Sequence, residues 1–379
     1  MSDLIYLDHN ATTPVLPEVV ERMLPFLRDH FGNPSSGHAF GQLAHDAVER
    51  AREEVASLLG CVPSHVVFTS GGTESNNLSI RGVTAARPDR KGVITSRIEH
   101  PAVEQPCALL EGQGWSVTRL AVDGECRVDP AAAAAALTDD TCLLTVMLAN
   151  NETGTLQPLS ALARAARARG VVVHTDAAQA VGKVPTRVDE LGVDLLTVAG
   201  HKLYAPKGVG ALYIRPGTPL QPFMRGAGHE GGVRPGTENV AYIAGLGEAC
   251  AIAERTMADE SARQAELRDR LWSTLRAGIP GVVRNGDPRR CLPNTLNLSL
   301  PAVRGSTVLQ AAPLLAATTG SACHEGGERP SPVLSAMGID TDTALGAIRL
   351  SLGRSTTEDQ VDRAASAVVR AYHLCAGNP

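Results

Sequence analysis

Short runs of aliphatic and β-branched residues alternate with helix-forming stretches from about residue 65 to 215, and this alternation restricts the possible folds more than any other feature. Strands that alternate with helices are typical of a mostly parallel sheet with helices on both faces. Ligands of such sheets bind beyond the carboxyl ends of the strands. The runs that predict strands are HVVFT (65–69), GVITS (92–96), SVTRL (116–120), CLLTVML (142–148), VVVHT (171–175), DLLTV (194–198) and GALYI (210–214).

The C-terminal third predicts a second, smaller α/β unit. Residues 240–277 carry a long helical pattern that would connect the two units. We therefore expect a large domain of residues 15–250, and a small domain that combines residues 1–14 with residues 251–379, including the connecting helix. The N-terminal segment should fold back across both domains. The elements expected in the small domain are strands at 294–300, 314–318 and 347–353 and helices at 331–337 and 357–373.

The composition argues against several classes of function. The chain has 379 residues and a formal net charge of −5, which does not favour a direct nucleic-acid surface. We expect a cytoplasmic protein without a membrane span, because no signal-peptide pattern follows Met1 and no stretch reaches ~20 apolar residues. The eight cysteines are scattered without a C-x-x-C pair, so we expect neither a disulfide framework nor a bound metal.

The sequence VVFTSGGTESNN predicts a strand that runs through a glycine turn into a helix. Exposed amides at such a helix start, with no β-carbon on Gly71 or Gly72, can cradle a phosphate, and Thr73 can add a hydroxyl. Nothing here matches the nucleotide P-loop pattern. The alternative is a structural turn in which Thr73 caps the helix.

An acid and a lysine follow two later strands. Asp176 lies at the end of VVVHT and Lys202 lies in a Gly-His-Lys turn after DLLTV. A carboxylate placed there either caps the next helix or pairs with a buried cation, such as the pyridinium nitrogen of pyridoxal phosphate (PLP). A lysine at the mouth of a parallel sheet can have a lowered pKa and form a Schiff base, whereas an ordinary surface lysine is the alternative.

Three more polar residues follow strand ends. His100 precedes a proline that begins a helix, and it could stack on a cofactor ring, move protons, or serve as an ordinary structural histidine. Asn151 and Gln179 could hydrogen-bond a ring oxygen or cap a loop.

Cys323 differs from the other cysteines because it lies in a polar, glycine-rich loop, TTGSACHEGGERPSP. A thiolate in such a place is a strong nucleophile, and His324 can lower the pKa of the neighbouring thiol. An incidental exposed cysteine is the alternative.

The chain resembles the cysteine desulfurases of the NifS/IscS kind, within the fold-type-I enzymes that use PLP. This resemblance implies a large domain with a mostly parallel seven-stranded sheet plus a small C-terminal α/β domain. Eight motifs in the same order carry it: YLDHNATTP (6–14), GNPSS (32–36), SGGTESNN (70–77), HTDAAQAVGK (174–183), GHKLYAPKGVG (200–210), RPGTEN (234–239), GSAC (320–323) and IRLSLGR (348–354).

The resemblance also implies an activity and its residues. L-cysteine would be converted to L-alanine, with the sulfur transferred to Cys323 as a persulfide and then delivered to an acceptor protein by a homodimer. Lys202 would bind PLP covalently, Asp176 would pair with the pyridine nitrogen, and His100 would stack on the ring. The remaining contacts would come from Gln179 at the phenolic oxygen, from Gly72, Thr73, His201 and Thr237 of the partner subunit at the phosphate, and from Asn33, Asn151 and Arg349 at the substrate carboxylate.

The sequence departs from this family pattern in places that concern specificity. Ala199 stands where many relatives carry a serine for the phosphate, and His229, Gly231 and Pro235 replace common Gln, Arg and Ser. Residues 324–327 differ from iron–sulfur housekeeping members, which leaves iron–sulfur assembly, tRNA thiolation and a specialised pathway such as DNA phosphorothioation open. The alternatives are a selenocysteine lyase or another PLP-dependent lyase, and a non-catalytic docking module for sulfur-transfer proteins.

Overall fold

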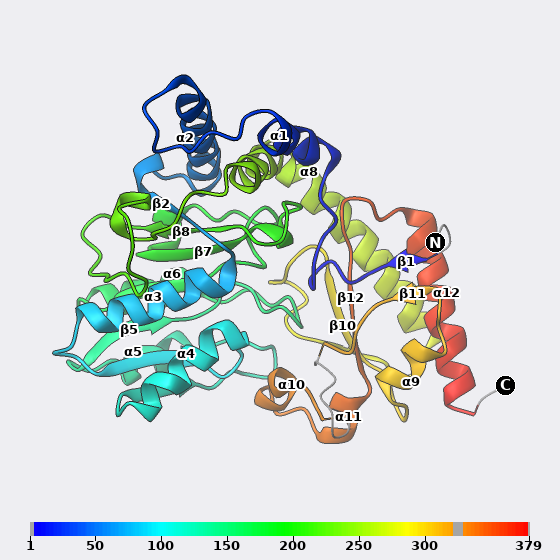
Figure 1. The fold of residues 1–379 in the computed structure, drawn as a ribbon. Coiled ribbons are helices and arrows are strands. Elements are labelled where there is room, and N and C mark those ends of the chain that lie inside the picture. Colours follow the sequence, from blue (N-terminus) through cyan, green and yellow to red (C-terminus); the bar gives the residue numbers. More distant parts are fainter. Residues whose placement is uncertain (1–3, 321–328, 378–379) are drawn as a thin grey trace.

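The computed structural model describes residues 4–320 and 329–377. These residues form a seven-stranded sheet in the order β2-β8-β7-β6-β5-β3-β4 (Figure 1). Only β8 runs antiparallel to its neighbours among these strands, so the predicted mostly parallel sheet is confirmed. The strands are β2 (Val66–Thr69), β3 (Gly92–Ser96), β4 (Ser116–Leu120), β5 (Thr141–Thr145), β6 (Val172–Asp176), β7 (Leu195–Ala199) and β8 (Gly210–Ile214).

Strand β5 ends three residues earlier than the apolar run predicts. The chain leaves the regular ladder after Thr145, but the amides of Val146 and Leu148 still donate to the carbonyls of His174 and Asp176 at 3.2 and 2.9 Å. Apolar composition alone does not mark this change, because the departing residues stay buried. The chain thereby stays beside β6 up to its carboxyl end.

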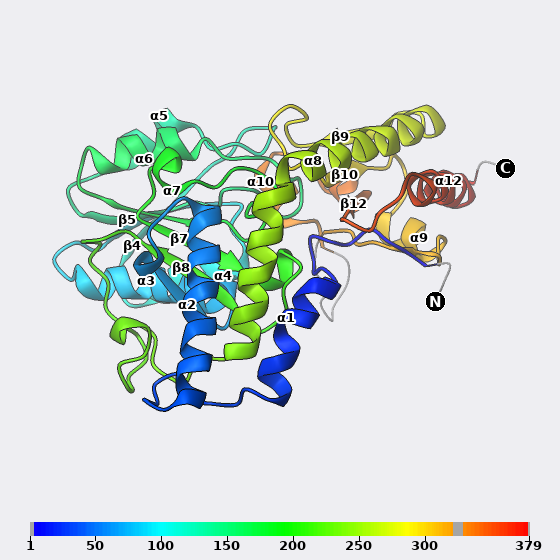
Figure 2. The same ribbon diagram turned by 90° about the horizontal axis from the view of Figure 1, so that it is seen from above.

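Helices cover both faces of the large sheet (Figures 1 and 2). One face packs on α3 (Gly72–Ala86) and α4 (Pro101–Gly112) through side chains such as Leu78 and Val103. The other face packs on helices from both ends of the large unit. These are α1 (Pro17–Arg28), α2 (Ala39–Leu59), α5 (Pro130–Ala136), α6 (Leu159–Arg167), α7 (Val188–Leu191) and the first half of α8 (Val240–Gly278).

Helix α8 is the predicted connector, and it runs from the large sheet into the small unit (Figure 2). Its first half buries Ile243 and Leu246 in the same core as the large sheet. Its second half buries Leu267 and Leu271 in a separate core with the C-terminal elements. One continuous helix therefore belongs to two hydrophobic cores. The boundary near residue 250 stays a proposal, and Ile252 and Ala253 still lie in the core of the large sheet.

The small unit contains short sheets and the last helices. Among the described residues, β12-β10-β9 form an antiparallel sheet, and β1 pairs with β11 in parallel. The sequence pattern missed β1 and β9 because two or three residues are too few to show a period. The elements are β1 (Ile5–Tyr6), β9 (Val283–Asn285), β10 (Thr295–Ser299), β11 (Leu315–Ala316), β12 (Ala347–Ser351), α9 (Gly305–Gln310), α10 (Pro332–Ala336), α11 (Thr341–Leu345) and α12 (Glu358–Cys375).

The N-terminal segment joins the two units. Strand β1 lies in the small unit, and the residues after it cross to the large one, where the Thr13 amide donates to the His201 carbonyl at 3.0 Å. Helix α1 then packs on α8 and places Val19 in the core of the large sheet. The segment 7–13 thus lies between the two units and beside the carboxyl ends of the strands. Within the described ranges, no helix is long and apolar enough to cross a membrane.

Candidate active site at the carboxyl ends of the strands

Lys202 follows β7 in a short 3₁₀ turn, Gly200–Lys202. Its Nζ donates to the backbone carbonyl of Ala11 at 2.7 Å and also to that of Asn10. Desolvation lowers the pKa of Lys202 to about 8, and the positive charge of Arg349 adds to this shift while Asp8 and Asp176 oppose it. The ammonium is therefore partly deprotonated near neutral pH, unlike that of a surface lysine.

Asp176 is the last residue of β6, next to β7 in the sheet, and only 8% of its surface is exposed. One carboxylate oxygen accepts from the Ala178 amide at 2.9 Å, and the other accepts from the Asn76 side chain at 2.7 Å. The sheet therefore brings the acid and Lys202 to one edge, close enough for Asp176 to raise the pKa of that lysine. The two hydrogen bonds hold the carboxylate in a fixed orientation.

The glycine turn before α3 leaves open space at the helix start. Gly71 is the N-cap of α3, with φ of 144°, and no side chain caps the first turn. Thr73 is exposed and lies inside the helix, so the alternative in which Thr73 caps α3 is wrong. A β-carbon added to Gly71 would meet nothing within 4 Å, whereas one added to Gly72 would lie 3.3 Å from the Ala199 side chain. The free amides and the open space fit a phosphate group.

The two histidines near Lys202 have fixed partners. His100 caps α4 through Nδ1, which accepts from the Ala102 amide at 3.1 Å. Partial desolvation lowers the pKa of the His100 imidazole, while Asp176 opposes this shift and Lys202 adds to it. The Nδ1 of His201 lies 3.2 Å from the Thr12 hydroxyl, and desolvation lowers its pKa to about 4. Both rings are therefore neutral at pH 7, and His100 has its Nε2 left for another contact.

Gln179 lies in the turn that follows β6, three residues after Asp176, and it is almost completely buried. Its side-chain nitrogen donates to the Asn10 carbonyl at 2.9 Å, and its side-chain oxygen accepts from Lys183 at 3.2 Å. Desolvation lowers the pKa of Lys183 to about 7, and the charges of Lys202 and Arg349 reinforce that shift. Gln179 is thus oriented by its neighbours toward the same edge of the sheet as Lys202.

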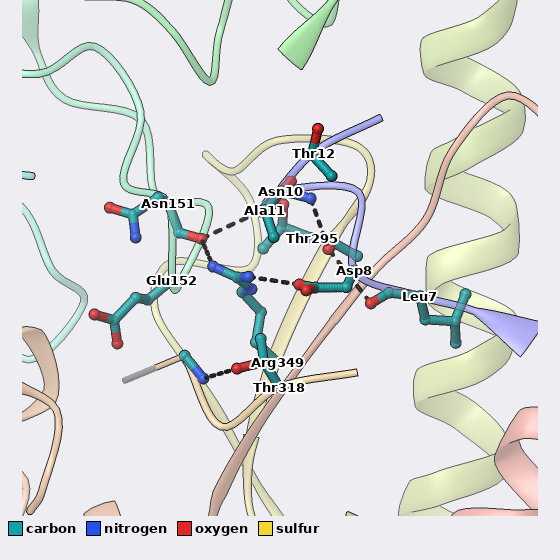
Figure 3. A network of polar contacts seen from close by, with 12 residues as sticks. Leu7, Asp8, Asn10, Ala11, Thr12, Asn151, Glu152, Thr295, Thr318 and Arg349 are labelled. Atoms are coloured by element: carbon teal, nitrogen blue, oxygen red, sulfur yellow. Dashed lines mark hydrogen bonds and ion pairs between the residues drawn. The ribbon is translucent and has the colours of Figure 1, made fainter. Parts of the chain in front are cut away.

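Arg349 lies on β12 of the small unit, 5% exposed, and reaches the N-terminal segment (Figure 3). Its Nη2 lies 2.6 Å from Asp8 Oδ1, and its Nη1 donates to the backbone carbonyl of Asn151 at 2.9 Å. The side chain of Asn151 points away from Arg349 in Figure 3 and makes no hydrogen bond to any other residue described. Asn151 therefore contacts this arginine through its backbone, which the sequence did not indicate.

The structure does not join the remaining predicted residues to this group. Asn33 is exposed in the loop between α1 and α2, where its side chain accepts from the Ser35 amide at 2.9 Å, and none of its hydrogen bonds within the described ranges reaches Arg349. Thr237 is exposed in the segment before α8. Cys323 and residues 324–327 lie outside the described residues. The roles of these residues stay predictions.

Several residues of the site escaped the sequence analysis because their partners are remote in the chain. Asn10 is fully buried, and its backbone and side chain join both units. They contact Lys202, Gln179 and the Asn151 carbonyl on one side, and Asn294, Thr295 and Ser351 on the other. The only sequence signal for them is the concentration of polar residues in YLDHNATTP, a motif that also carries the family resemblance.

Glu99 is a second carboxylic acid that the sequence analysis did not select. It accepts from the Met147 amide at 3.0 Å and from the Ser96 hydroxyl at 2.5 Å. Desolvation raises its pKa to about 8; the Ser96 and Met147 hydrogen bonds oppose this shift, and Asp176 adds to it. Glu99 is therefore largely protonated at pH 7, which leaves Asp8 and Asp176 as the negative charges that act on Lys202.

Replacing Glu99 with glutamine should make the stability of the protein less dependent on pH. A folded pKa near 8 against an ordinary value of 4.5 means that the folded state holds the extra proton between these values. The wild-type free energy of unfolding should therefore fall as pH rises from about 5 to 8, by at most about 1.4 kcal/mol per pH unit from this group. Urea unfolding at several pH values measures the slope, with Glu125→Gln at an exposed position as the control. Equal slopes for wild type and Glu99→Gln would contradict the prediction.

The donor groups at this edge fit PLP. The open amides before α3 suit a phosphate, the buried Asp176 suits a protonated pyridine nitrogen, and the Lys202 amine suits an aldehyde carbon. The buried Asn76 also leaves its side-chain oxygen without a hydrogen-bond partner among the described residues. Within residues 4–320 and 329–377, no group of three or more His, Cys, Asp or Glu side chains could hold a metal ion.

Comparison with known proteins assigns a family to this arrangement. The family model described as aminotransferase class-V matches residues 5–364. The chain is 47% identical to a protein of Trichormus azollae named "Cysteine desulfurase" and 46% identical to "Cysteine desulfurase NifS" of Azotobacter vinelandii, each over 95% of this chain and 90% of the relative.

Solved structures agree with the sequence comparison. A "NIFS-LIKE PROTEIN" superposes with a TM-score of 0.92 at 36% identity, and covers 98% of this chain and 100% of its own. "SspA in complex with cysteine" has a TM-score of 0.83 at 36% identity, with 92% and 98% covered. DndA from Streptomyces lividans has a TM-score of 0.79 at 39% identity, with 90% and 97% covered.

Proposed function

We propose, since this chain belongs to the aminotransferase class-V family and is a cysteine desulfurase, that Lys202 and Asp176 hold its PLP and that Cys323 accepts the sulfur of L-cysteine. The family and its cysteine desulfurase members use PLP in general. The observation that carries the residue assignment is the placement of Lys202 and Asp176 at the ends of adjacent strands, beside an open helix start. This is the arrangement that a pyridine ring with a phosphate at one end requires.

The other cofactor contacts follow from the same geometry. The amides of Gly72 and Thr73 and the ring of His201 would bind the phosphate, with Thr237 of the partner subunit added in a homodimer. Gln179 would reach the phenolic oxygen, and the exposed face of His100 would stack on the ring. PLP, when bound, supplies an electron sink that stabilises negative charge on the substrate α-carbon.

The residues of the chain would divide the reaction among them. Arg349 would bind the substrate carboxylate, and the neutral amine of Lys202 would take the proton from the α-carbon. Neutral His100 would carry the proton of a thiol. The Cys323 thiolate would then form a bond to the substrate sulfur as the carbon–sulfur bond breaks, and the electron pair of that bond would be protonated on carbon to give alanine.

The partners of the reaction are also proposals. L-cysteine as the substrate is supported by the cysteine desulfurase relatives and by the solved SspA complex with cysteine. We propose a homodimer and a sulfur-acceptor protein from the resemblance alone. The likeness to DndA fits DNA phosphorothioation as one destination of the sulfur, beside iron–sulfur assembly and tRNA thiolation.

The purified protein should form alanine from L-cysteine in preference to selenocysteine or other amino acids.

Removal of the α-proton should depend on Lys202. Desolvation lowers the pKa of this amine to about 8, so the neutral form appears above about pH 8 rather than above its ordinary 10.5. Exchange of the α-hydrogen of L-alanine for deuterium should therefore rise about tenfold per pH unit below 8 and level off above it.

This exchange is measured by NMR in D₂O and does not require Cys323. The Cys323→Ser variant is accordingly the matched control, and it should keep the same pH profile. An exchange rate that does not rise with pH, or wild-type exchange in Lys202→Ala, would remove Lys202 from the proposed role. Failure to form alanine from L-cysteine would overturn the proposed function as a whole.

A further inference from the structure

Asp8 places a carboxylate inside the region proposed for the carboxylate of the substrate. Its Oδ1 lies 2.6 Å from Arg349 Nη2, and 22% of its side chain is exposed (Figure 3). Strand pairing fixes this position, because β1 pairs with β11 and Asp8 forms a parallel bridge with Ser351 of β12. The Tyr6 hydroxyl also donates to the backbone carbonyl of Asp8 at 3.1 Å. The carboxylate is therefore held in place by the backbone of the N-terminal segment.

Arg349 depends on Asp8 for charge compensation. The guanidinium is almost completely buried, and its other described side-chain hydrogen bond is to the neutral carbonyl of Asn151. Glu152 also interacts with the charge of Arg349, but desolvation raises the pKa of this acid to about 7. The Nε of Arg349 has no hydrogen-bond partner in the part of the chain that the structure describes. A buried charge without a counter-ion is strongly unfavourable, so Asp8 balances Arg349 while N–H groups of the fork stay available to another acceptor.

Asp8 also lies near the amine side of the site. Lys202 donates to the carbonyls of Asn10 and Ala11, which follow Asp8 closely in the same segment. The charge of Asp8 acts on Lys202 as well, and raises its pKa against the effect of desolvation. One fixed negative charge is thus shared between two positive groups, the guanidinium of Arg349 and the amine of Lys202.

We propose that Asp8 makes the carboxylate site at Arg349 selective for zwitterionic α-amino acids over simple carboxylates. This inference rests on the proposed function, in which Arg349 binds the carboxylate of the substrate. A simple carboxylate that approaches Arg349 is repelled by Asp8, and it has no positive group that could be attracted to Asp8. An amino acid brings an ammonium group that is attracted to Asp8, while its carboxylate takes the unused N–H groups of Arg349.

A pair of ligands of equal shape tests this selectivity. N,N-dimethylglycine is a zwitterion whose tertiary amine cannot condense with an aldehyde, and isovalerate is its isostere with CH in place of the protonated nitrogen. Each is used as a competitive inhibitor of alanine formation from L-cysteine by the holoenzyme, and each is also titrated in a thermal-shift assay. The wild type should bind N,N-dimethylglycine about tenfold more tightly than isovalerate.

The Asp8→Asn variant keeps the shape of the side chain and removes its charge. It should bind isovalerate about tenfold more tightly than the wild type does and N,N-dimethylglycine more weakly, so that the preference disappears or reverses. Asp8→Glu keeps the charge and should retain the preference for the zwitterion. Asp362→Asn removes an acid from an exposed ion pair with Arg270 on α12 and α8, and it should change neither inhibition constant.

The outcomes separate this inference from the function on which it rests. Arg349 is not the carboxylate site if neither ligand competes with L-cysteine in the wild type, or if Arg349→Gln leaves both inhibition constants unchanged. Either result would overturn both the proposed role of Arg349 in substrate binding and the proposed role of Asp8 in selectivity. If both ligands compete but Asp8→Asn keeps the wild-type ratio, only the role of Asp8 is refuted. Should Asp8→Asn fail to fold, equal binding of the two ligands by the wild type would refute that role without the variant.

Discussion

Lys202→Ala is expected to lose the covalent bond between protein and cofactor and to lower the rate of alanine formation by at least about 10³-fold. The reason is that one amine has two tasks, to hold the cofactor and to remove the α-proton. The neutral amine needed for both is available because desolvation lowers the pKa of Lys202 to about 8. An alanine at this position can do neither.

Borohydride reduction followed by peptide mapping measures the bond directly. In the wild type, the label should appear on the peptide that contains Lys202, and Lys202→Ala should carry none. Lys207→Ala is the matched control, because Lys207 is exposed five residues later in the same segment and should leave both label and rate unchanged.

Lys183 is the amine that could contradict this assignment. It is 7% exposed, and desolvation lowers its pKa to about 7. However, its Nζ donates to the backbone carbonyl and the side-chain oxygen of Gln179, at 3.0 and 3.2 Å, and these hydrogen bonds occupy the amine. Label on Lys183 in the wild-type protein would show that the wrong lysine has been chosen.

Cys323→Ser should keep the bound cofactor and the exchange of the α-hydrogen but lose catalytic sulfur transfer, by about 10³-fold or more. A serine hydroxyl is almost entirely protonated at neutral pH, whereas a few per cent of an ordinary thiol is thiolate. The expected result is alanine at background rate and no persulfide on the protein, measured by amino-acid analysis and by mass spectrometry of the intact chain.

Five of the other seven cysteines are poor substitutes for Cys323. Desolvation raises the pKa of Cys61 to about 11 and those of Cys107, Cys126 and Cys142 to about 12, and it raises the pKa of the fully buried Cys250 as well. Cys291 is half-buried, so Cys291→Ser is the control that should retain full transfer. Wild-type turnover by Cys323→Ser, or a persulfide on Cys291, would refute the choice of nucleophile.

The strands of the large sheet were predictable because their signal is local. Each is a short run of apolar and β-branched residues bounded by turn residues, as with β7, which follows Gly192 in the left-handed region at φ of 72°. The predicted connector at 240–277 agrees with α8 for the same reason. β1 and β9 carry no such signal, since a strand of two or three residues exists only through its partner.

Some residues of the candidate site could likewise be predicted from local sequence, and others could not. Lys202, Asp176 and His100 could be selected because each follows a strand in a parallel sheet, and the carboxyl ends of parallel strands meet at one edge. Asn76 and Glu99 could not, because an amide on a helix or an acid beside a histidine has no distinctive local pattern. Their importance comes from which carboxylate or amide lies next to them in the folded chain.

The sequence alone indicated the sheet, the edge of the sheet where the candidate site lies, and the family. It could do so because strand period, turn residues and motif spacing are signals that extend over only a few neighbouring residues. Folding was needed to pair Asp8 with Arg349, which lie 341 residues apart, and to place the Asn10 carbonyl on Lys202, 192 residues away. Such contacts arise when two units pack around one segment, and the physical reason they escape local reading is that burial and charge depend on neighbours in space rather than along the chain.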